Sequence, residues 1–388
     1  MTKTKRIDRK IICVVGARPN FIKIAPIMAV MGERDSGVRA LLVHTGQHYD
    51  NAMNDQFFKD LGIPAPHFNL GVGSGSHASQ TAEVMLRFEP YLDVEKPDAV
   101  LVVGDVNSTL ACALVAVKKG IPVIHVEAGL RSRDRSMPEE INRILTDQIS
   151  DLLFLTEQEA SANLIAEGIH EKRMRFAGNV MIDTLFSNLK HASAVDEVFA
   201  RVNAPDWCTE RHFSLLTLHR PSNVDEEATL RSLLTTVSMV SMHVPVVFPV
   251  HPRTKSRIEQ FDLGGLLENK RILLLPPAGY LDLLGLMKKA RFVMTDSGGI
   301  QEETTALGVP CLTLRENTER PVTVSQGTNT LVGTDRDQIL TAANKVLHGG
   351  GKSGRIPEYW DGNTARRIVS MIGDWFEKRD LQEIDHAA

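Results

Sequence analysis

Short runs of consecutive apolar residues alternate along the first half of the chain with longer segments of helical pattern. The apolar runs occupy 10–16, 39–46, 98–105 and 122–129. The segments of helical pattern between them occupy 22–31, 54–62 and 108–120. Continuous apolar strands that are each followed by a helix are typical of a parallel sheet covered on both faces. The pattern therefore predicts a doubly wound α/β domain.

The same alternation begins again after a polar segment around 188–210. Its apolar runs occupy 213–220, 244–252, 271–277, 291–299 and 310–317. We therefore expect a duplicated architecture, with one Rossmann-like domain over 1–187 and a second over 188–362. The segment 363–388 is predicted to form a helix that packs back on the first domain.

Length and composition agree with two domains and exclude several classes of protein. A chain of 388 residues exceeds the size of most single cores. Its 43% hydrophobic and 24% charged residues are ordinary for a soluble protein, and no apolar run approaches the roughly 20 residues that span a bilayer. A net charge of −4 argues against a nucleic-acid partner. The basic segment 1–10 lacks the apolar stretch of a signal peptide, so we expect a cytoplasmic protein with no membrane partner.

The sequence predicts neither a cofactor nor a metal site. Its four cysteines are far apart and lack C-x-x-C spacing, which indicates reduced core residues. The glycine- and serine-rich tract at 70–80 does not link a strand directly to a helix, as a dinucleotide fingerprint requires. The carboxylates that follow the predicted strands form neither a D-x-D motif nor a paired His-carboxylate spacing.

Polar and charged residues follow nearly every predicted strand. Ligands of open parallel sheets bind outside the carboxyl ends of the strands, so these positions are candidates for function. The alternative is that strand ends are polar because they are exposed. The candidates in the two halves are Arg18, Lys23, Gln47, His48, Asp105, Glu127 and Arg131, and then His219, Arg220, His251 and the segment 296–299.

Two groups of these residues suggest particular chemistry. Backbone N–H groups at 297–299 begin a predicted helix, which suits a phosphate, although a capped turn explains the same pattern. Arg18 and Arg320 favour a diphosphate, since cations add charge-assisted hydrogen bonds.

Asp105, Glu127 and Glu139 are expected to form a carboxylate cluster. Close like charges raise at least one pKa, as acid/base work near neutral pH requires. A structural ion pair between Glu127 and Arg131 is the competing interpretation.

The order of the motifs resembles that of a known family. The matching motifs are GARPNFIKIAPI, TGQHYD, GDVNSTLA, HVEAGLRS, MPEEINR, GN with Asp183, LHR, PVHP, DSGGIQEE, TERP and GTNTLVG. They occur in the order seen in the non-hydrolysing UDP-N-acetylglucosamine 2-epimerases, and the resemblance extends over roughly 11–375. It implies a GT-B type fold, with two Rossmann-like domains and the active site in the cleft between them. It also implies a UDP-sugar substrate, interconversion of UDP-GlcNAc and UDP-ManNAc, and a homodimer.

The resemblance also implies roles for single residues. The acid/base positions of the family fall on Asp105, Glu127, Glu139 and His219. The nucleotide contacts fall on Arg18, Lys23, Ser297, Gly298, Gly299, Glu303 and Arg320. The implied mechanism is anti elimination of UDP to a 2-acetamidoglucal, followed by re-addition with the proton delivered to the opposite face.

Some features depart from the family pattern or leave alternatives open. Ser222 replaces a common glutamate in the motif HRxEN. Gln47, His48, Glu139 and Arg220 match parts of a regulatory site for a second UDP-GlcNAc, but the Arg-Gln pair of that site is not recognisable around 71–80.

Four other functions compete with UDP-GlcNAc 2-epimerisation. They are 2-epimerisation of a UDP-diacetamido-uronate, a hydrolysing 2-epimerase, a GT-B glycosyltransferase, and a UDP-sugar-binding regulator without catalysis.

Overall fold

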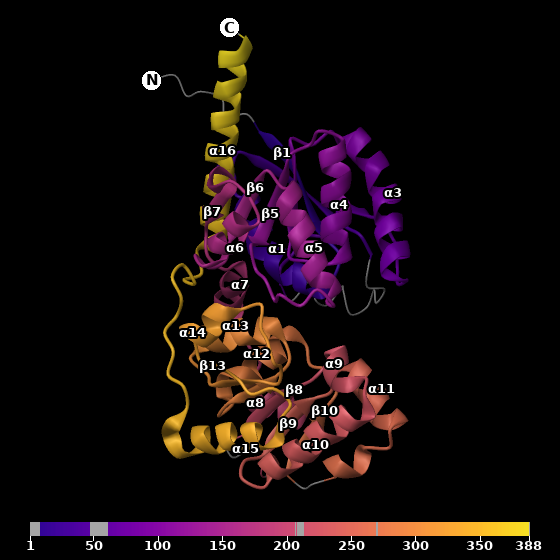
Figure 1. Ribbon diagram of the computed structural model, residues 1–388, viewed down its shortest axis with the longest axis vertical. Coiled ribbons are helices and arrows are strands. Elements are labelled where there is room, and N and C mark those ends of the chain that lie inside the picture. Colours follow the sequence, from indigo (N-terminus) through magenta and orange to yellow (C-terminus); the bar gives the residue numbers. More distant parts are fainter. Residues whose placement is uncertain (1–7, 47–60, 206, 208–212, 269–270, 388) are drawn as a thin grey trace. The chain divides into compact units, whose positions relative to one another are not determined.

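The chain folds into two compact units, each built around one parallel sheet (Figure 1). The computed structural model describes residues 8–46, 61–205, 207, 213–268 and 271–387. The N-terminal unit comprises Met1–Thr184 and Glu358–Ala388, and the C-terminal unit comprises Leu185–Pro357. The prediction of two Rossmann-like α/β domains is confirmed.

The sheet of the N-terminal unit has its described strands in the order β3-β2-β1-β4-β5-β6-β7. All adjacent pairs are parallel. The strands are β1 (Arg9–Val15), β2 (Val38–His44), β3 (Phe68–Asn69), β4 (Ala99–Val103), β5 (Val123–Ala128), β6 (Leu152–Leu155) and β7 (Met174–Phe176). The strand order reverses between β1 and β4, which is the switch point of a doubly wound sheet.

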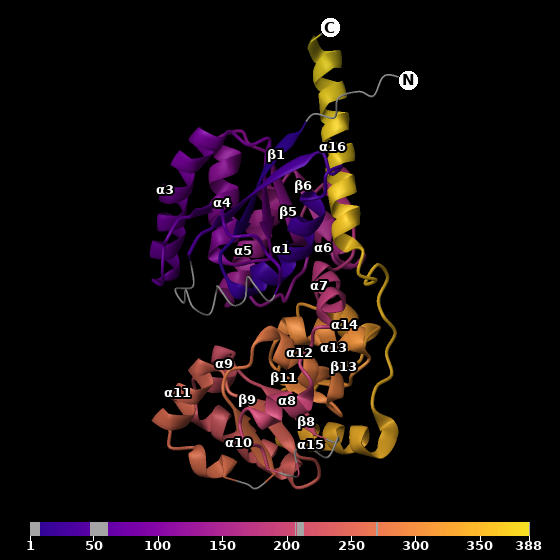
Figure 2. The same ribbon diagram turned by 180° about the vertical axis from the view of Figure 1, so that it is seen from behind.

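Helices cover both faces of this sheet. The helices α3 (His77–Glu95), α4 (Asn107–Lys118) and α5 (Pro138–Ile149) lie side by side on one face (Figure 1). The helices α1 (Arg18–Met31) and α16 (Thr364–Ala387) pack together on the other face (Figure 2). Two shorter helices, α6 (Ala160–Ala166) and α7 (Val180–Asn188), follow β6 and β7. The side chains of Val84, Phe88 and Leu92 on α3 fill the core beneath it.

Long-range hydrogen bonds join α16 to the rest of the N-terminal unit. The buried carboxylate of Asp183 accepts from the backbone N–H groups of Thr364 and Ala365 at 3.1 and 2.7 Å. Burial raises the pKa of Asp183 despite these bonds. The indole of Trp360 donates to the carbonyl of Thr156 at 3.0 Å. The start of α16 is therefore capped by a residue far away in sequence.

The sheet of the C-terminal unit has its described strands in the order β10-β9-β8-β11-β12-β13, again parallel. The strands are β8 (Ser214–Thr217), β9 (Val246–Pro249), β10 (Ile272–Leu275), β11 (Val293–Thr295), β12 (Cys311–Thr313) and β13 (Asn329–Leu331). The main covering helices are α10 (Glu227–Ser241), α12 (Tyr280–Lys289), α13 (Gly298–Leu307) and α15 (Arg336–Lys345). The shorter helices are α8 (Val195–Ala200), α9 (Pro221–Val224), α11 (Pro252–Gln260) and α14 (Pro321–Ser325). Here the strand order reverses between β8 and β11.

Two further observations concern cysteines and membranes. Cys13, Cys112 and Cys311 are buried and free, whereas Cys208 lies outside the described residues. In the part of the chain that the structure describes, no helix is long and apolar enough to cross a membrane.

Candidate functional site

The candidate residues of the N-terminal unit follow the strands at its switch point. Lys23 lies on α1, directly after β1, and Asp105 lies two residues beyond β4. Glu127 lies near the end of β5, which pairs with β4 in parallel. Candidate side chains that follow strands on both sides of the switch point therefore lie at the edge of the sheet where ligands of this fold bind.

The backbone of Glu127 is in the left-handed region, with φ of 74°. The register between β5 and β6 shifts between Val126 and Ala128, so Glu127 forms a β-bulge. Bulges and left-handed non-glycine residues redirect side chains and are concentrated at functional sites. Glu127 is 5% exposed and forms an ion pair with Lys23, which is also 5% exposed. The two charges therefore neutralise each other in a desolvated position.

Gly104 allows Lys23 to approach the end of β4. A Cβ atom at Gly104 would lie 2.9 Å from the ammonium nitrogen of Lys23, and the φ of Gly104 is 67°. The backbone conformation disfavours any other residue here, and a Cβ atom would displace the ammonium group of Lys23.

Arg143 links Asp105 to the helix α5. Its guanidinium contacts the carboxylate of Asp105 and lies 2.8 Å from that of Glu140. Glu140 is buried and also accepts from the backbone N–H groups of Ser132 and Arg133 at 2.9 and 2.8 Å. In the described part of the chain, the half-buried Glu139 makes no side-chain hydrogen bond or ion pair that joins it to this cluster. Its role as a third acid/base group stays a prediction.

Arg131 contacts acidic residues on two helical segments. It lies 2.8 Å from Asp147 on α5 and 2.6 Å from Glu167. The structure therefore pairs Glu127 with Lys23, whereas the competing interpretation expected a pair of Glu127 with Arg131.

The candidate residues of the C-terminal unit lie at its own switch point. His219 follows β8, and Asp296 follows β11. The Nδ1 atom of His219 lies 2.8 Å from the fully buried carboxylate of Asp296. Burial alone would raise the pKa of Asp296, but the His219 ring and the backbone N–H groups of His219 and Arg220 outweigh it and lower that pKa. An ionised Asp296 therefore orients the partly exposed imidazole of His219.

The start of α13 offers backbone donors without a local cap. Ser297 occupies the N-cap position, but its side chain makes no capping hydrogen bond, and the first turn carries no acidic residue. The capped-turn interpretation thus lacks both of its expected features. Gly298 and Gly299 form the first turn, and a Cβ atom at Gly298 would lie 2.7 Å from a carboxylate oxygen of Glu319.

Arginine side chains surround the Glu319 carboxylate beside this helix end. Arg315 lies 2.9 Å from it, Arg220 lies 3.4 Å from it, and Arg320 lies 3.9 Å from it. The Nε atom of Arg320 is also 2.9 Å from Glu302. The N–H of Ser297 already donates to the hydroxyl of Thr295 at 3.0 Å, so Gly298 and Gly299 are the remaining backbone donors proposed for an anion. The concentration of guanidinium groups next to them suits such a ligand.

Glu303 is a buried carboxyl group with a strongly shifted pKa. Burial, together with the nearby Glu302, raises its pKa to about 8, although the Tyr280 hydroxyl acts in the opposite direction. At neutral pH Glu303 is therefore largely protonated and can donate a hydrogen bond.

Several predicted residues contribute no side-chain geometry. Gln47 and His48 lie outside the described residues, and for Arg18 only its place at the start of α1 is described. Ser222 is exposed on α9. Among the described residues, no group of three or more potential ligands could hold a metal ion.

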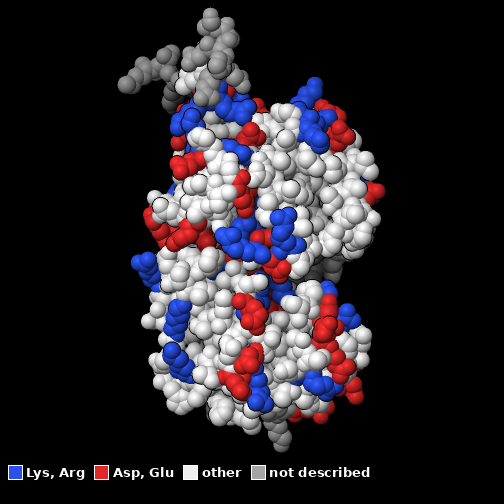
Figure 3. Space-filling view, viewed as in Figure 1, with Lys and Arg blue, Asp and Glu red and all other residues white. Residues whose placement is uncertain are grey.

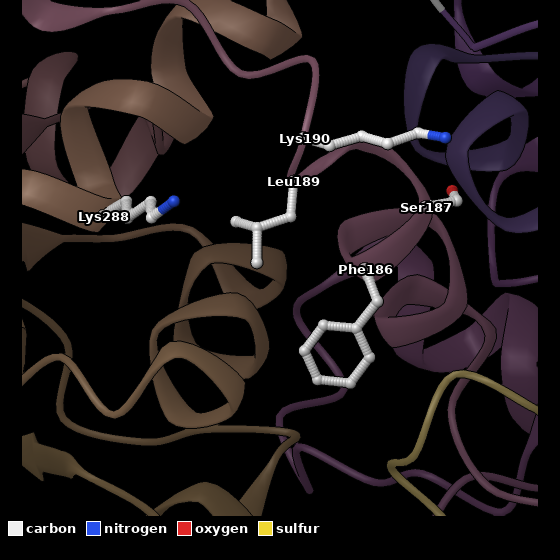
Figure 4. Close-up of a pocket in the computed structure, with 5 residues that line it drawn as sticks. All are labelled: Phe186, Ser187, Leu189, Lys190 and Lys288. Carbon is white, nitrogen blue, oxygen red and sulfur yellow. The ribbon is translucent and has the colours of Figure 1, made fainter.

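A pocket of about 540 Å³ in the C-terminal unit contains none of the candidate residues. Its lining residues are Phe186, Ser187, Leu189, Lys190 and Lys288. Their side chains diverge rather than converge (Figure 4). Because binding sites combine apolar walls with converging polar groups, we assign this pocket no role.

Sequence reasoning missed several residues that hold the candidates in place. Arg143, Asp147 and Glu140 lie on α5, and their side chains are buried. The four-residue spacing of Arg143 and Asp147, which places both on one face of the helix, was the available signal.

The two parallel sheets, with candidate residues at each switch point, define a protein of the GT-B type with two Rossmann-like domains. The family model described as UDP-N-acetylglucosamine 2-epimerase matches residues 31–373. The chain belongs to this family.

Individual relatives agree with the family assignment. A UDP-N-acetylglucosamine 2-epimerase of Methanococcus maripaludis is 42% identical over 371 residues, covering 94% of this chain and 98% of the relative. A UDP-2,3-diacetamido-2,3-dideoxy-D-glucuronate 2-epimerase of Pseudomonas aeruginosa is 40% identical over 365 residues, covering 90% and 99%. The crystal structure of Methanocaldococcus jannaschii UDP-GlcNAc 2-epimerase in complex with UDP-GlcNAc and UDP has a TM-score of 0.85 and 41% identity, covering 94% and 99%.

Proposed function

We propose that the protein is a UDP-N-acetylglucosamine 2-epimerase that interconverts UDP-GlcNAc and UDP-ManNAc. The observation that carries the proposal is the pair of carboxylates, Asp105 and Glu127, on adjacent strand ends, where Glu127 is held in a left-handed bulge. Family membership and the similarity to epimerases over nearly the whole chain support the same activity.

The proposed mechanism is elimination followed by re-addition. A carboxylate removes the proton at C-2 while UDP leaves from the anomeric carbon, which gives a bound 2-acetamidoglucal. UDP then adds back, and a second group returns a proton to the opposite face of C-2. Asp105, Glu127 and Glu139 are the candidates for these two transfers, because inversion requires groups on both faces.

The C-terminal unit supplies the proposed binding site for the nucleotide. The uncapped start of α13 and Arg320 would hold the diphosphate, and His219 would steady it as a leaving group. Glu303 of the same unit is a further proposed nucleotide contact, and Lys23 and Arg18 are the contacts proposed for the N-terminal unit. Glu303 enters as a hydrogen-bond donor, since its pKa of about 8 keeps it protonated at neutral pH.

A diacetamido-uronate version of the sugar is the second candidate substrate. The Pseudomonas aeruginosa relative with that name is 40% identical, close to the 42% of the archaeal UDP-GlcNAc enzyme.

Incubation with each UDP-sugar alone, followed by identification of the products, separates the possible functions. Formation of the 2-epimer of UDP-GlcNAc supports the proposal. If only the diacetamido-uronate sugar is epimerised, that sugar is the substrate instead of UDP-GlcNAc. Free ManNAc with UDP indicates hydrolysis. Absence of any product without an acceptor indicates a glycosyltransferase, or a regulator if acceptors also give none.

We also propose a homodimer formed through the α3–α5 apolar surface, which consists of Leu86, Val94, Val117, Ile141 and Leu145. Their exposed fractions range from 36% to 77%. Figure 3 shows few charged side chains over α3 and α4. An exposed apolar surface of this kind is typical of an interface, and a second copy of the chain is the proposed partner.

A second UDP-GlcNAc as activator is a further part of the proposal. Arg220 supports it, since its guanidinium lies in the arginine cluster beside α13. A sigmoidal dependence of rate on UDP-GlcNAc that Arg220→Ala makes hyperbolic would support it. A hyperbolic dependence in the unchanged protein would contradict it.

A further inference from the structure

We infer that His125 and Asp147 form a buried ion pair that positions the two carboxylates Asp105 and Glu127. The inference rests on the proposed function, because it assigns this pair to the same proton-transfer site. Both residues are fully buried, His125 in β5 and Asp147 on α5.

Both ring nitrogens of His125 make hydrogen bonds. Its Nδ1 lies 2.7 Å from one carboxylate oxygen of Asp147, and its Nε2 lies 2.8 Å from the carbonyl oxygen of Gly104. A carbonyl oxygen can only accept, so Nε2 carries a hydrogen. Nδ1 also donates if the carboxylate of Asp147 is ionised.

The other contacts of Asp147 favour that ionised form. Its second oxygen accepts from the backbone N–H of Gly129 at 3.1 Å and from the guanidinium of Arg131 at 2.8 Å. Arg131 therefore stabilises a negative charge on Asp147, and with that charge in place the His125 ring donates from both nitrogens. The further charges near this pair are Glu167, which binds Arg131, and the ion pair of Lys23 with Glu127.

The carboxylate of Asp147 holds the backbone on both sides of Glu127. It binds the side chain of His125, two residues before Glu127, and the backbone N–H of Gly129, two residues after it. The left-handed bulge at Glu127 lies between these two contacts. One helical side chain therefore fixes the segment that presents this carboxylate.

The imidazole of His125 extends the same restraint to Asp105. Its Nε2–H holds the carbonyl of Gly104, the residue directly before Asp105. On the same helix, Arg143 lies one turn before Asp147 and contacts the Asp105 carboxylate. The pair thus links the backbone of β4 and β5 at the points where the two carboxylates leave the sheet.

This arrangement makes His125 and Asp147 positioning residues. Both nitrogens of His125 are engaged and its ring is inaccessible, so it cannot exchange protons with a substrate. Desolvation offsets most of the attraction within a buried ion pair, so its contribution is chiefly geometric.

Two matched substitutions each preserve one of the two hydrogen bonds. In His125→Asn the side-chain amide can still donate to Asp147, and in His125→Gln it can reach the carbonyl of Gly104. We expect kcat to fall by about a hundredfold in both, as for small displacements of reacting groups. UDP affinity and KM should stay unchanged. Exchange of the C-2 proton with solvent should slow in parallel with kcat.

A purely structural role predicts a different result. The variants would then lose thermal stability while the folded fraction kept the kcat of the original enzyme, which would overturn the inference. If the original enzyme epimerises no UDP-sugar, the proposed function is wrong. That outcome is distinguishable from failure of this inference, in which the original enzyme is active and the variants keep its kcat.

Nuclear magnetic resonance of the unsubstituted protein tests the inference without an activity measurement. Histidine labelled with 15N in its ring should give two similar, protonated nitrogen signals for His125, assigned through its backbone. A neutral ring with one unprotonated nitrogen would overturn the inference, even if the variants failed to fold.

Discussion

At Glu127 the backbone conformation and the charge environment are both unusual. A left-handed conformation costs a residue with a side chain about 1–3 kcal/mol, which the surrounding structure must offset. Here the bulge in β5 and the pair with Lys23 hold the residue in place. The carboxylate at the end of this apolar strand is therefore held in position by the surrounding fold.

Replacing this carboxylate by an amide tests its chemical role. Glu127→Gln keeps the shape of the side chain but removes its ability to accept a proton. Turnover should fall by about a hundredfold or more, while UDP still binds. The exposed Glu171 gives the control Glu171→Gln, which should leave turnover unchanged. Equal losses of UDP affinity and turnover would make Glu127 a binding or folding residue.

Glu303 makes a second residue-scale prediction, on the pH dependence of stability. Its pKa in the folded state, about 8, exceeds the ordinary value of 4.5, so the folded chain retains a proton that the unfolded chain releases. Its contribution to the free energy of unfolding is therefore complete below a pH of about 4.5. The contribution falls, by at most about 1.4 kcal/mol per pH unit, until pH reaches about 8.

Urea unfolding of the original protein and of Glu303→Gln across this pH range measures the difference. The Gln variant should lack this component of the pH slope, whereas Glu268→Gln, a change at an exposed position of the same unit, should retain it. Identical slopes for all three proteins would show that Glu303 titrates normally in the folded state.

At the scale of elements, the helix α13 combines an uncapped start with neighbouring guanidinium groups. Arg320 is 5% exposed and is held by Glu302, so its position is fixed without a ligand. Arg320→Ala should weaken UDP binding by about 1.5–3 kcal/mol, the value of a charge-assisted hydrogen bond. Calorimetric titration with UDP measures this, with Arg336→Ala on the exposed face of α15 as the control. Unchanged UDP affinity in Arg320→Ala would remove Arg320 from the site.

The predicted and missed elements differ in how much local signal they carry. The runs that became β1, β4 and β5 are continuous and apolar, so the sequence predicted them and the parallel sheet they form. The strands β3, β6, β7 and β13 were not predicted. Their pairing is stabilised by neighbouring strands, and a single sequence does not carry that contribution.

The candidate site was predictable to a similar extent. Asp105 and Glu127 were identified because they end apolar runs. The buried contacts of Asp147 and Arg143 depend on how α5 packs against the sheet, which is a tertiary feature. The contact of Arg143 with Glu140 likewise depends on which side of the helix faces the core.

On the scale of the whole molecule, the two units carry complementary candidate chemistry. The N-terminal unit holds the carboxylates Asp105 and Glu127 with their cationic partners. The C-terminal unit holds the start of α13 with its arginine cluster. Within each unit these residues lie at the switch point of its own sheet. In the proposed function, the duplicated fold thus divides proton transfer and diphosphate binding between two similar frameworks.

The proposed dimer is also a property of the whole molecule. Leu86→Asp introduces a charge into the α3–α5 apolar surface and should convert a dimer to a monomer, because burying an unpaired carboxylate is costly. Met242→Asp changes an equally accessible apolar residue of the C-terminal unit and should leave the dimer intact. Sedimentation velocity distinguishes these states. A monomeric original protein, or a Leu86→Asp variant that stays dimeric, would contradict the proposed interface.

The central claim is that one carboxylate removes the proton at C-2 and a second group returns a proton to the opposite face, and isotope exchange tests it most directly. UDP-GlcNAc is incubated with the protein in deuterium oxide, and the product is analysed by mass spectrometry and nuclear magnetic resonance. Elimination and re-addition predict deuterium at C-2 of the UDP-ManNAc formed, since carboxylates exchange their protons with solvent. Epimerised product that retains its original hydrogen at C-2 would contradict this mechanism and the roles proposed for Asp105, Glu127 and Glu139.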